Sequence, residues 1–180
     1  REGLASIAAC LKNTGIEVSL FKVESGLPED SFIKLFDEHF FDYTLAGFTM
    51  NTVDVSEASR LSGILKKHYS GIFTIAGGIH PTLAPEDSIS LPGLDAICRG
   101  EGEYALLELC EQLKEGKNPS GIEGLWIQKN DKIEKNRIRP LIEDLDSLPK
   151  PLRTARTITS YPADSVKDFT FFVASRGCPY

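Results

Sequence analysis

Three short segments of this 180-residue chain, residues 49–52, 77–82 and 99–103, follow apolar runs and have the residue types of a binding site for a large ligand. Ligands of parallel sheets bind beyond the carboxyl ends of the strands. Polar side chains there can hydrogen-bond to ligand amides, and paired glycines let the backbone pass close to a flat ligand because no Cβ intervenes. An alternative is that the glycines only turn the chain. The candidate cofactor-binding residues are Thr49, Asn51, Thr52, Gly77, Gly78, His80, Pro81, Gly100 and Glu101.

The third segment also matches a dinucleotide-binding pattern. Residues 100–105 read Gly-Glu-Gly-Glu-Tyr-Ala, which fits G-x-G-x-x-G/A between a predicted strand and a predicted helix. Two glutamates at the start of a helix complement its dipole themselves and would repel a pyrophosphate. The pattern also follows the last predicted strand of the unit rather than the first, so we disfavour dinucleotide binding.

The histidines and three of the four cysteines suggest core or surface residues rather than a metal site. His39 falls on the apolar face of a predicted helix and is expected in the core, whereas His68 is expected in solvent. No histidine pair has metal-ligand spacing. Cys10, Cys98 and Cys110 are expected as small buried hydrophobic residues.

Helix and strand patterns alternate along the first 115 residues. This alternation predicts an α/β fold, a doubly wound, flavodoxin- or Rossmann-like parallel sheet with helices on both faces. Asp54 and Glu57 have the spacing of a capping box at the start of one helix. A flavodoxin-like strand order needs a central strand before the first helix, and we expect that strand to precede residue 1. The predicted strands are 17–23, 43–50, 71–76 and 94–99.

After Gly116 the pattern changes. Residues 124–128 and 132–136 predict a β-hairpin, and four prolines between 138 and 164 predict an interdomain linker. We therefore divide the chain into an α/β domain at 1–120, an appended β-hairpin at 121–137 and a linker at 138–168, followed by the start of another domain at 169–180.

Composition narrows the classes of partner. The net charge is −6, with 20 Lys and Arg against 26 Asp and Glu and no basic run, which disfavours nucleic acid. No apolar stretch approaches the roughly 20 residues that cross a bilayer. The first residues do not resemble a signal peptide, and the cysteines lack disulfide-like spacing, so we expect a cytoplasmic protein.

These loops, in this order, resemble the cobalamin-binding domain of B12-dependent radical S-adenosylmethionine proteins, many of which are labelled anaerobic magnesium-protoporphyrin IX monomethyl ester cyclases. The likeness covers nearly the whole chain and implies that a corrin lies across the strand ends. It rests on residues 76–82, 95–103, 140–149 and 176–179.

Two elements of B12 domains are matched only in part. Thr49 matches the Ser or Thr of an S-x-L element and precedes Gly77 by 28 residues, but Asn51 replaces the Leu. No D-x-H-x-x-G occurs, because Asp42 stands in place of the glycine after His39. The resemblance therefore implies that no protein histidine serves as the lower ligand of the cobalt.

Cys178 is expected to bind an iron–sulfur cluster. It follows an apolar run and an Arg-Gly pair, and this arrangement resembles the opening of a radical S-adenosylmethionine barrel, whose first cluster cysteine lies in a C-x3-C-x2-C loop. Three thiolates hold three irons of a [4Fe–4S] cluster and leave the fourth for S-adenosylmethionine. The resemblance implies that 169–180 begin this barrel, which would be the partner of the domain in the same polypeptide.

The sequence thus predicts the cobalamin-binding domain of a radical enzyme that performs methyl transfer or a cyclase-like oxidative cyclisation. The small-molecule substrate stays unidentified, and this chain alone is expected to catalyse nothing. One alternative is a docking domain of a radical enzyme that has lost cobalamin, which would lack visible absorbance. The other is a nucleotide-binding Rossmann domain, which NAD or NADP would stabilise.

Overall fold

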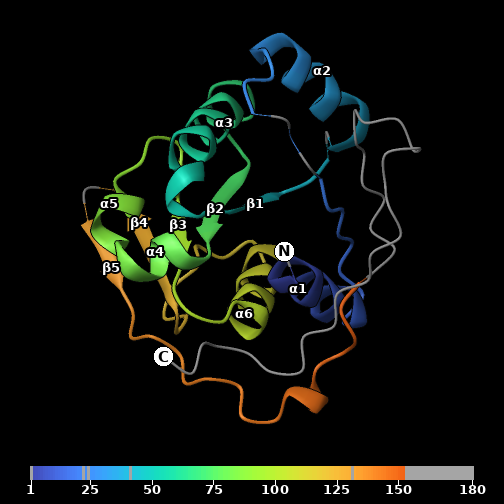
Figure 1. The fold of residues 1–180 in the computed structure, drawn as a ribbon, viewed down its shortest axis with the longest axis vertical. Helices are drawn as coiled ribbons and strands as arrows, with labels where there is room; N and C mark the ends of the chain where they lie inside the picture. The colour runs from blue at the N-terminus through green and yellow to red at the C-terminus, as the bar shows by residue number, and fades with distance from the viewer. Residues whose placement is uncertain (1, 22, 24, 41, 131, 153–180) are drawn as a thin grey trace.

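Five strands form a single sheet in the order β1-β2-β3-β4-β5 (Figure 1). β1 (Leu45–Thr49), β2 (Phe73–Gly77) and β3 (Ala96–Cys98) are parallel. β4 (Leu125–Lys129) and β5 (Lys132–Lys135) form the predicted hairpin, which continues the same sheet in antiparallel orientation. The predicted α/β class is confirmed. The computed structural model describes residues 2–21, 23, 25–40, 42–130 and 132–152.

Helices cover both faces of this sheet. α1 and α6 lie side by side on one face, and α2 and α3 lie on the other (Figure 1). Within the described residues, every helix is too short or too polar to traverse a lipid bilayer. The helices are α1 (Glu2–Asn13), α2 (Glu29–Phe40), α3 (Val55–His68), α4 (Ile79–Leu83), α5 (Pro85–Ile89) and α6 (Glu103–Lys114), with 3-10 turns η1 (Thr52–Asp54) and η2 (Leu145–Ser147).

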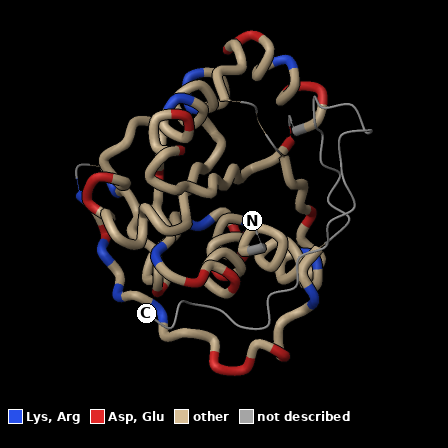
Figure 2. Tube along the Cα trace, viewed as in Figure 1, with Lys and Arg blue, Asp and Glu red and all other residues tan. Residues whose placement is uncertain are grey.

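The core forms where apolar helix faces meet uncharged strands. Leu106 of α6 packs with Ile75 and Ala96 on one face, and Phe32 of α2 packs with Leu65 of α3 on the other. Charged residues occur on the helices, the hairpin and the segment after it, whereas β1, β2 and β3 contain none (Figure 2). All three residues of β3 are buried, as expected for a parallel strand covered on both faces.

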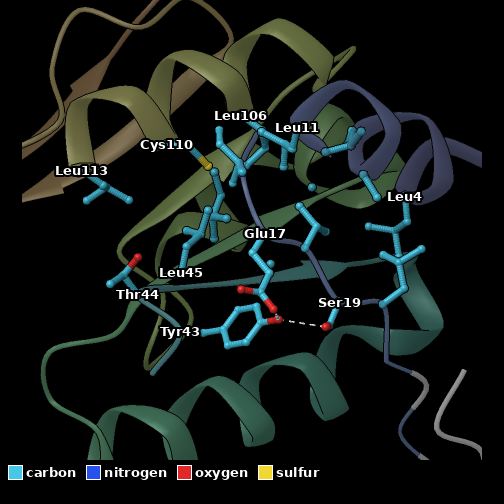
Figure 3. A pocket seen from close by; sticks show the side chains of 18 of the residues that line it. Leu4, Leu11, Glu17, Ser19, Tyr43, Thr44, Leu45, Leu106, Cys110 and Leu113 are labelled. Atoms are coloured by element: carbon cyan, nitrogen blue, oxygen red, sulfur yellow. Dashed lines mark hydrogen bonds between the residues drawn. The ribbon is translucent and has the colours of Figure 1, made fainter. Parts of the chain in front are cut away.

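The strand predicted at residues 17–23 is wrong for the residues that the structure describes. Residues 17–20 belong to no strand, and Phe21 forms only an isolated bridge. The alternating apolar pattern is present, but a cavity separates this segment from β1 (Figure 3). Because a strand requires a backbone partner, the pattern alone does not make one.

The capping box predicted at Asp54 is also wrong. A 3-10 turn precedes α3, and the cap lies three residues earlier, where the Asn51 N–H donates to the Asp54 carboxylate at 3.4 Å. Glu57 instead accepts hydrogen bonds from Arg60 at 2.7 and 2.8 Å. That guanidinium holds the pKa of Glu57 below its ordinary value.

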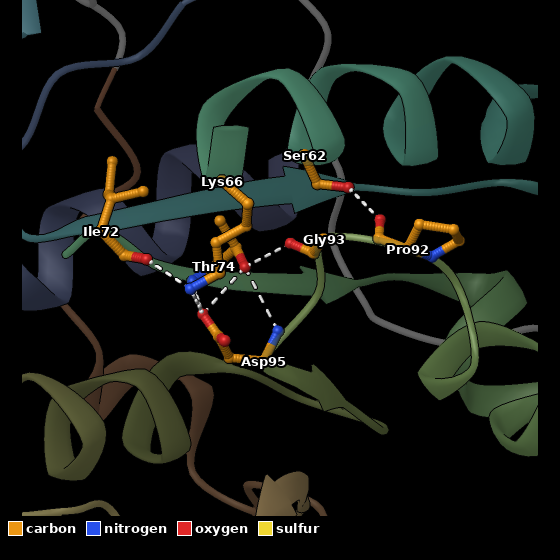
Figure 4. Close-up of polar contacts among 7 residues, drawn as sticks. All are labelled: Ser62, Lys66, Ile72, Thr74, Pro92, Gly93 and Asp95. Atoms are coloured by element: carbon orange, nitrogen blue, oxygen red, sulfur yellow. Dashed lines mark hydrogen bonds and ion pairs between the residues drawn. The ribbon is translucent and has the colours of Figure 1, made fainter. Parts of the chain in front are cut away.

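A polar network at the amino ends of β2 and β3 fastens α3 to the sheet (Figure 4). One oxygen of Asp95 accepts from the Thr74 backbone N–H at 2.7 Å and lies 3.0 Å from the Thr74 hydroxyl. Lys66 of α3 places its ammonium 2.6 Å from the same oxygen and donates to the Ile72 carbonyl at 2.8 Å. A single carboxylate therefore joins a helix and two strands.

Replacing Asp95 with alanine should lower the free energy of unfolding by about 2–3 kcal/mol, because Thr74 and Lys66 would lose a charged acceptor in a half-buried site. Urea unfolding measures this change. The control is Glu115→Ala, which removes an exposed ion pair with Lys117 and should cost no more than about 0.5 kcal/mol. Equal losses in the two variants would contradict a special role for Asp95.

Candidate functional site

The carboxyl ends of the three parallel strands are level, and the candidate residues follow them directly. In the register of the sheet, Thr49 is opposite Gly77, and Gly77 is opposite Cys98. The segments after β1, β2 and β3 therefore meet at one edge, where Gly78 and Gly100 both line a shallow depression. The structure places the candidate residues together, and their role in binding stays a prediction.

Hydrogen bonds connect the first and second segments at this edge. The Met50 N–H donates to the Gly77 carbonyl at 2.8 Å, and the Met50 carbonyl accepts from the His80 N–H at 3.2 Å. The Thr52 hydroxyl lies 3.3 Å from Nδ1 of His80. Both side chains reach solvent, so each can also contact a ligand.

Thr82 connects the second segment with the third, although the sequence analysis did not choose it. Its hydroxyl donates to the Gly78 carbonyl at 2.8 Å and accepts from the Gly100 N–H at 3.0 Å. The available signal was its place in the glycine loop, five residues after Gly77. One hydroxyl thus fixes the distance between two loops that border the site.

Several candidate residues have structural contacts of their own. The Glu101 carboxylate accepts from the Ile142 N–H at 2.6 Å and so holds the segment after the hairpin. Pro81 is buried in α4, and the Asn51 side-chain amide donates to Asp54 at 3.2 Å. Cys178 lies outside the described residues, as does the rest of 153–180.

Gly78 adopts a backbone conformation that only glycine accepts readily. Its φ is 121° and its ψ is −161°. A Cβ at this position would lie 2.9 Å from the Met50 carbonyl oxygen and 3.2 Å from the Met50 nitrogen. The local fold therefore requires this glycine, because two backbone segments cross here.

Apolar side chains are exposed around the same edge. Val53 is 87% exposed, Ile79 62% and Leu83 78%. The depression has a volume of about 390 Å³ and is lined by Gly78, Ile79, Thr82, Leu83 and Gly100. Such an exposed apolar surface, with polar groups at its margin, is a candidate binding surface for a ligand. We call Val53, Ile79 and Leu83 the apolar rim.

A larger cavity of about 610 Å³ lies elsewhere, between β1, residues 15–20 and helices α1 and α6 (Figure 3). It extends along a face of the sheet rather than across the carboxyl ends. Of the candidate residues, only Gly77 lines it. The two cavities therefore need separate explanations.

The titratable residues away from this edge do not form a metal site. No group of three or more His, Cys, Asp or Glu that could hold a metal occurs among the residues that the structure describes. His39 is exposed rather than in the core as predicted, because the last turn of α2 extends past the apolar cluster. His68 is exposed as predicted and lies 2.9 Å from Glu29. Burial raises the pKa of the Cys98 thiol to about 12, so it stays protonated at neutral pH.

The family model for the B12 binding domain matches residues 2–110. The chain belongs to the B12-binding domain family. It is 33% identical to an uncharacterized methyltransferase, PH0819, of Pyrococcus horikoshii, over 99% of this chain and 38% of that protein. It is 26% identical to the anaerobic magnesium-protoporphyrin IX monomethyl ester cyclase of Synechocystis sp., over 99% of this chain and 36% of that protein. This B12-binding domain thus spans less than two fifths of the length of either relative.

Two solved structures share the fold. TsrM from Kitasatospora setae, a radical S-adenosylmethionine methyltransferase with cobalamin and a [4Fe-4S] cluster bound, matches with a TM-score of 0.63 at 21% identity over 83% of this chain and 28% of that chain. The cobalamin-dependent radical enzyme OxsB, with aqua-cobalamin and S-adenosylmethionine bound, matches with a TM-score of 0.65 at 20% identity over 78% of this chain and 20% of that chain.

Replacing Gly78 with alanine should reduce the free energy of unfolding by about 3 kcal/mol or more, since the new Cβ meets the Met50 backbone in a glycine-only conformation. The matched control is Gly116→Ala, where φ is also positive at 69° but no atom lies within 4 Å of the added Cβ. Gly116→Ala should lower the free energy of unfolding by about 1–2 kcal/mol. Urea midpoints that fall equally in the two variants would show that the contact with Met50 does not matter.

Proposed function

We propose that this B12-binding domain holds cobalamin across the level carboxyl ends of β1, β2 and β3, as one part of a radical S-adenosylmethionine enzyme. The observation that carries the proposal is the apolar rim beside the Gly78–Gly100 depression, because an exposed apolar surface with polar margins suits a corrin. The identity of the chain as a member of the B12-binding family supports it.

The residues at this edge divide into two groups by what they offer the cofactor. The apolar rim can pack against the corrin ring, while Thr52, His80 and Asn51 can hydrogen-bond to its amide side chains. Gly77, Gly78 and Gly100 lack side chains, so the ligand could approach the backbone closely between the apolar and polar groups. Bound cobalamin would supply a methyl group or act as an electron carrier.

The same edge is poorly suited to a dinucleotide. Glu103, in the first turn of α6, is only 3% exposed and already places a carboxyl group at the positive end of the helix. The preceding Glu101 carboxylate holds the Ile142 N–H at 2.6 Å. A pyrophosphate at this helix would meet two acidic side chains, which disfavours the Rossmann alternative.

Chemistry in the full-length protein would depend on a further domain. Relatives that this chain matches over little more than a third of their length are named as a methyltransferase and as a magnesium-protoporphyrin IX monomethyl ester cyclase. We propose that a radical barrel with a [4Fe–4S] cluster and S-adenosylmethionine follows the domain, begins near residue 169 and provides Cys178 as a cluster ligand. The domain alone would bind cofactor without catalysis. We also propose a reducing, cytoplasmic setting, in which Cys10, Cys98 and Cys110 stay reduced.

Leu83→Asp in the full-length protein should weaken cobalamin binding at least about tenfold, because burial of the leucine against the corrin is lost and a carboxylate must be desolvated. Titration of the visible absorbance of cobalamin measures the affinity. Leu83 is 78% exposed in this domain, so the substitution should leave the unfolding midpoint unchanged.

The matched control for this variant is Ile133→Asp, which places the same charge on β5, where Ile133 is 39% exposed and far along the sheet from the rim. It should bind cobalamin normally. Wild-type affinity in the Leu83→Asp protein would contradict the proposed position of the corrin. Absence of bound cobalamin in the unmodified protein would favour the docking-domain alternative.

Cys178→Ala in the full-length protein should remove the iron–sulfur cluster and abolish cleavage of S-adenosylmethionine. The two cysteines that remain cannot hold a cluster that needs three thiolate ligands. Iron content after anaerobic reconstitution and formation of 5′-deoxyadenosine measure the two effects. Cys110→Ala, at a half-buried position of α6, is the control and should retain both. Four irons per protein in the Cys178→Ala variant would exclude the assignment.

A further inference from the structure

Two exposed apolar side chains lie where the sequence predicts a linker. Besides the apolar rim and Ile133 on the hairpin, three large apolar side chains are exposed in the part of the chain that the structure describes. One is Tyr104, in the first turn of α6. The other two follow the hairpin, where Ile138 is 47% exposed and Leu141 is 74% exposed. Exposed apolar groups that gather in one place mark a binding surface, so this segment requires an explanation.

The segment has a fixed path. It leaves β5 and passes α6 on its way to η2 (Figure 1). Within residues 138–142, which we call the strap, the Arg139 guanidinium donates to the Glu108 carboxylate of α6 at 2.6 Å. The Ile142 N–H donates to the Glu101 carboxylate, also at 2.6 Å. The apolar side chains of the strap are therefore exposed although its backbone is held at two points.

Gly100 connects the strap with the depression beside the apolar rim. Its N–H donates to the Thr82 hydroxyl of α4, and Gly100 itself lines the depression. A Cβ on Gly100 would lie 3.4 Å from the Ile138 side chain, which is van der Waals contact. The surface of the depression therefore continues past Gly100 onto the strap.

The backbone of the strap offers hydrogen-bond donors. Among the described residues, no hydrogen bond is made by the N–H groups of Ile138, Arg139 and Leu141. Pro140 has no N–H, so the strap cannot extend the ladder of the hairpin. Unpaired backbone N–H groups bind carbonyl oxygens, including those of ligand amides. The strap thus combines apolar side chains with polar groups, as the apolar rim and its neighbours do.

The depression alone is too small for cobalamin. Its volume of about 390 Å³ is near the lower end of the range of about 300–1,000 Å³ for pockets that bind drug-sized ligands. Cobalamin is larger than such ligands, because it combines a corrin macrocycle with a nucleotide. A cofactor held over Gly100 must therefore contact residues beyond the depression. The apolar rim extends the surface on the α4 side, and the strap extends it past Gly100.

We propose that the strap forms a second wall of the cofactor site, in which Ile138 and Leu141 pack against the periphery of the corrin. The unpaired N–H groups of the strap bind amide side chains of the cofactor. This inference rests on the proposed function, since it takes cobalamin as the ligand of the carboxyl edge. It gives a binding role to a segment that the sequence predicts as a connection between domains.

Glu101 is a positioning residue in this arrangement, because its carboxylate holds the N–H next to Leu141 in the chain. Glu101→Ala in the full-length protein should weaken cobalamin binding at least about threefold by releasing the strap. Glu101→Gln keeps an oxygen acceptor and should restore most of the affinity. In the double variant with Leu141→Asp, the combined loss should be smaller than the product of the two single losses. Losses that multiply fully would overturn this role of Glu101.

Leu141→Asp in the full-length protein tests the wall itself. The variant should bind cobalamin at least about tenfold more weakly, because an apolar contact is lost and a carboxylate must be desolvated. Titration of the visible absorbance of cobalamin measures the affinity. The unfolding midpoint should not change, since Leu141 is exposed, and Ile133→Asp on β5 is the matched control with wild-type affinity.

The Leu83→Asp variant separates failure of this inference from failure of the proposed function. Wild-type affinity in Leu141→Asp, together with weak binding in Leu83→Asp, would overturn the strap and leave the corrin at the carboxyl edge. Wild-type affinity in both variants would overturn both proposals.

Photo-leucine placed at position 141 distinguishes direct contact with the cofactor from an effect on domain packing. Irradiation of the full-length protein with hydroxocobalamin bound should yield a peptide that contains residue 141 and carries the added mass of the cofactor. A cross-link from residue 141 to another segment of the protein, with none to cobalamin, would identify an interdomain contact and overturn the proposal.

Discussion

The close approach of Gly78 to the backbone of Met50 determines the geometry of the whole carboxyl edge. A Cβ on Gly78 would lie 2.9 Å from the Met50 carbonyl oxygen, so the two chains can cross only because this residue has no side chain. The crossing brings the His80 N–H to the same carbonyl and starts α4 directly above β2. Thr82, one turn later, then reaches both Gly78 and Gly100. The backbone crossing thus joins the first two loops, and the Thr82 hydroxyl joins the third to them.

Much of the fold was predictable because its signals are local. Uncharged apolar runs identified β1, β2 and β3, and a change to glycine or polar residues identified their ends. Two alternating segments, residues 124–128 and 132–136, identified the hairpin. Since parallel strands bring their carboxyl ends together, the same signals were enough to gather the candidate binding residues at one edge.

The remaining features depend on contacts between distant residues, which no local pattern encodes. Residues 17–20 alternate like a strand, but strand formation depends on a partner that the described chain does not provide. His39 has helical spacing from Phe32 and is nevertheless exposed, because it lies outside the apolar cluster that Phe32 and Phe36 of α2 form with α3. The exposure of Leu83 and the bond from Gly100 to Thr82 follow from how α4 packs, not from its sequence.

The Asp95 network and the loop crossing at Gly78 lie at opposite ends of the same strands. The first holds α3 on β2 and β3 through Lys66 and Thr74, and it has no residue in common with the carboxyl edge. Substitutions in the loops after β1, β2 and β3 can therefore change which groups surround a ligand while the anchor below them stays intact. Gly78 is the exception, because its replacement disturbs the crossing itself; the exposed loop positions can vary in sequence while α3 keeps its anchor on the sheet.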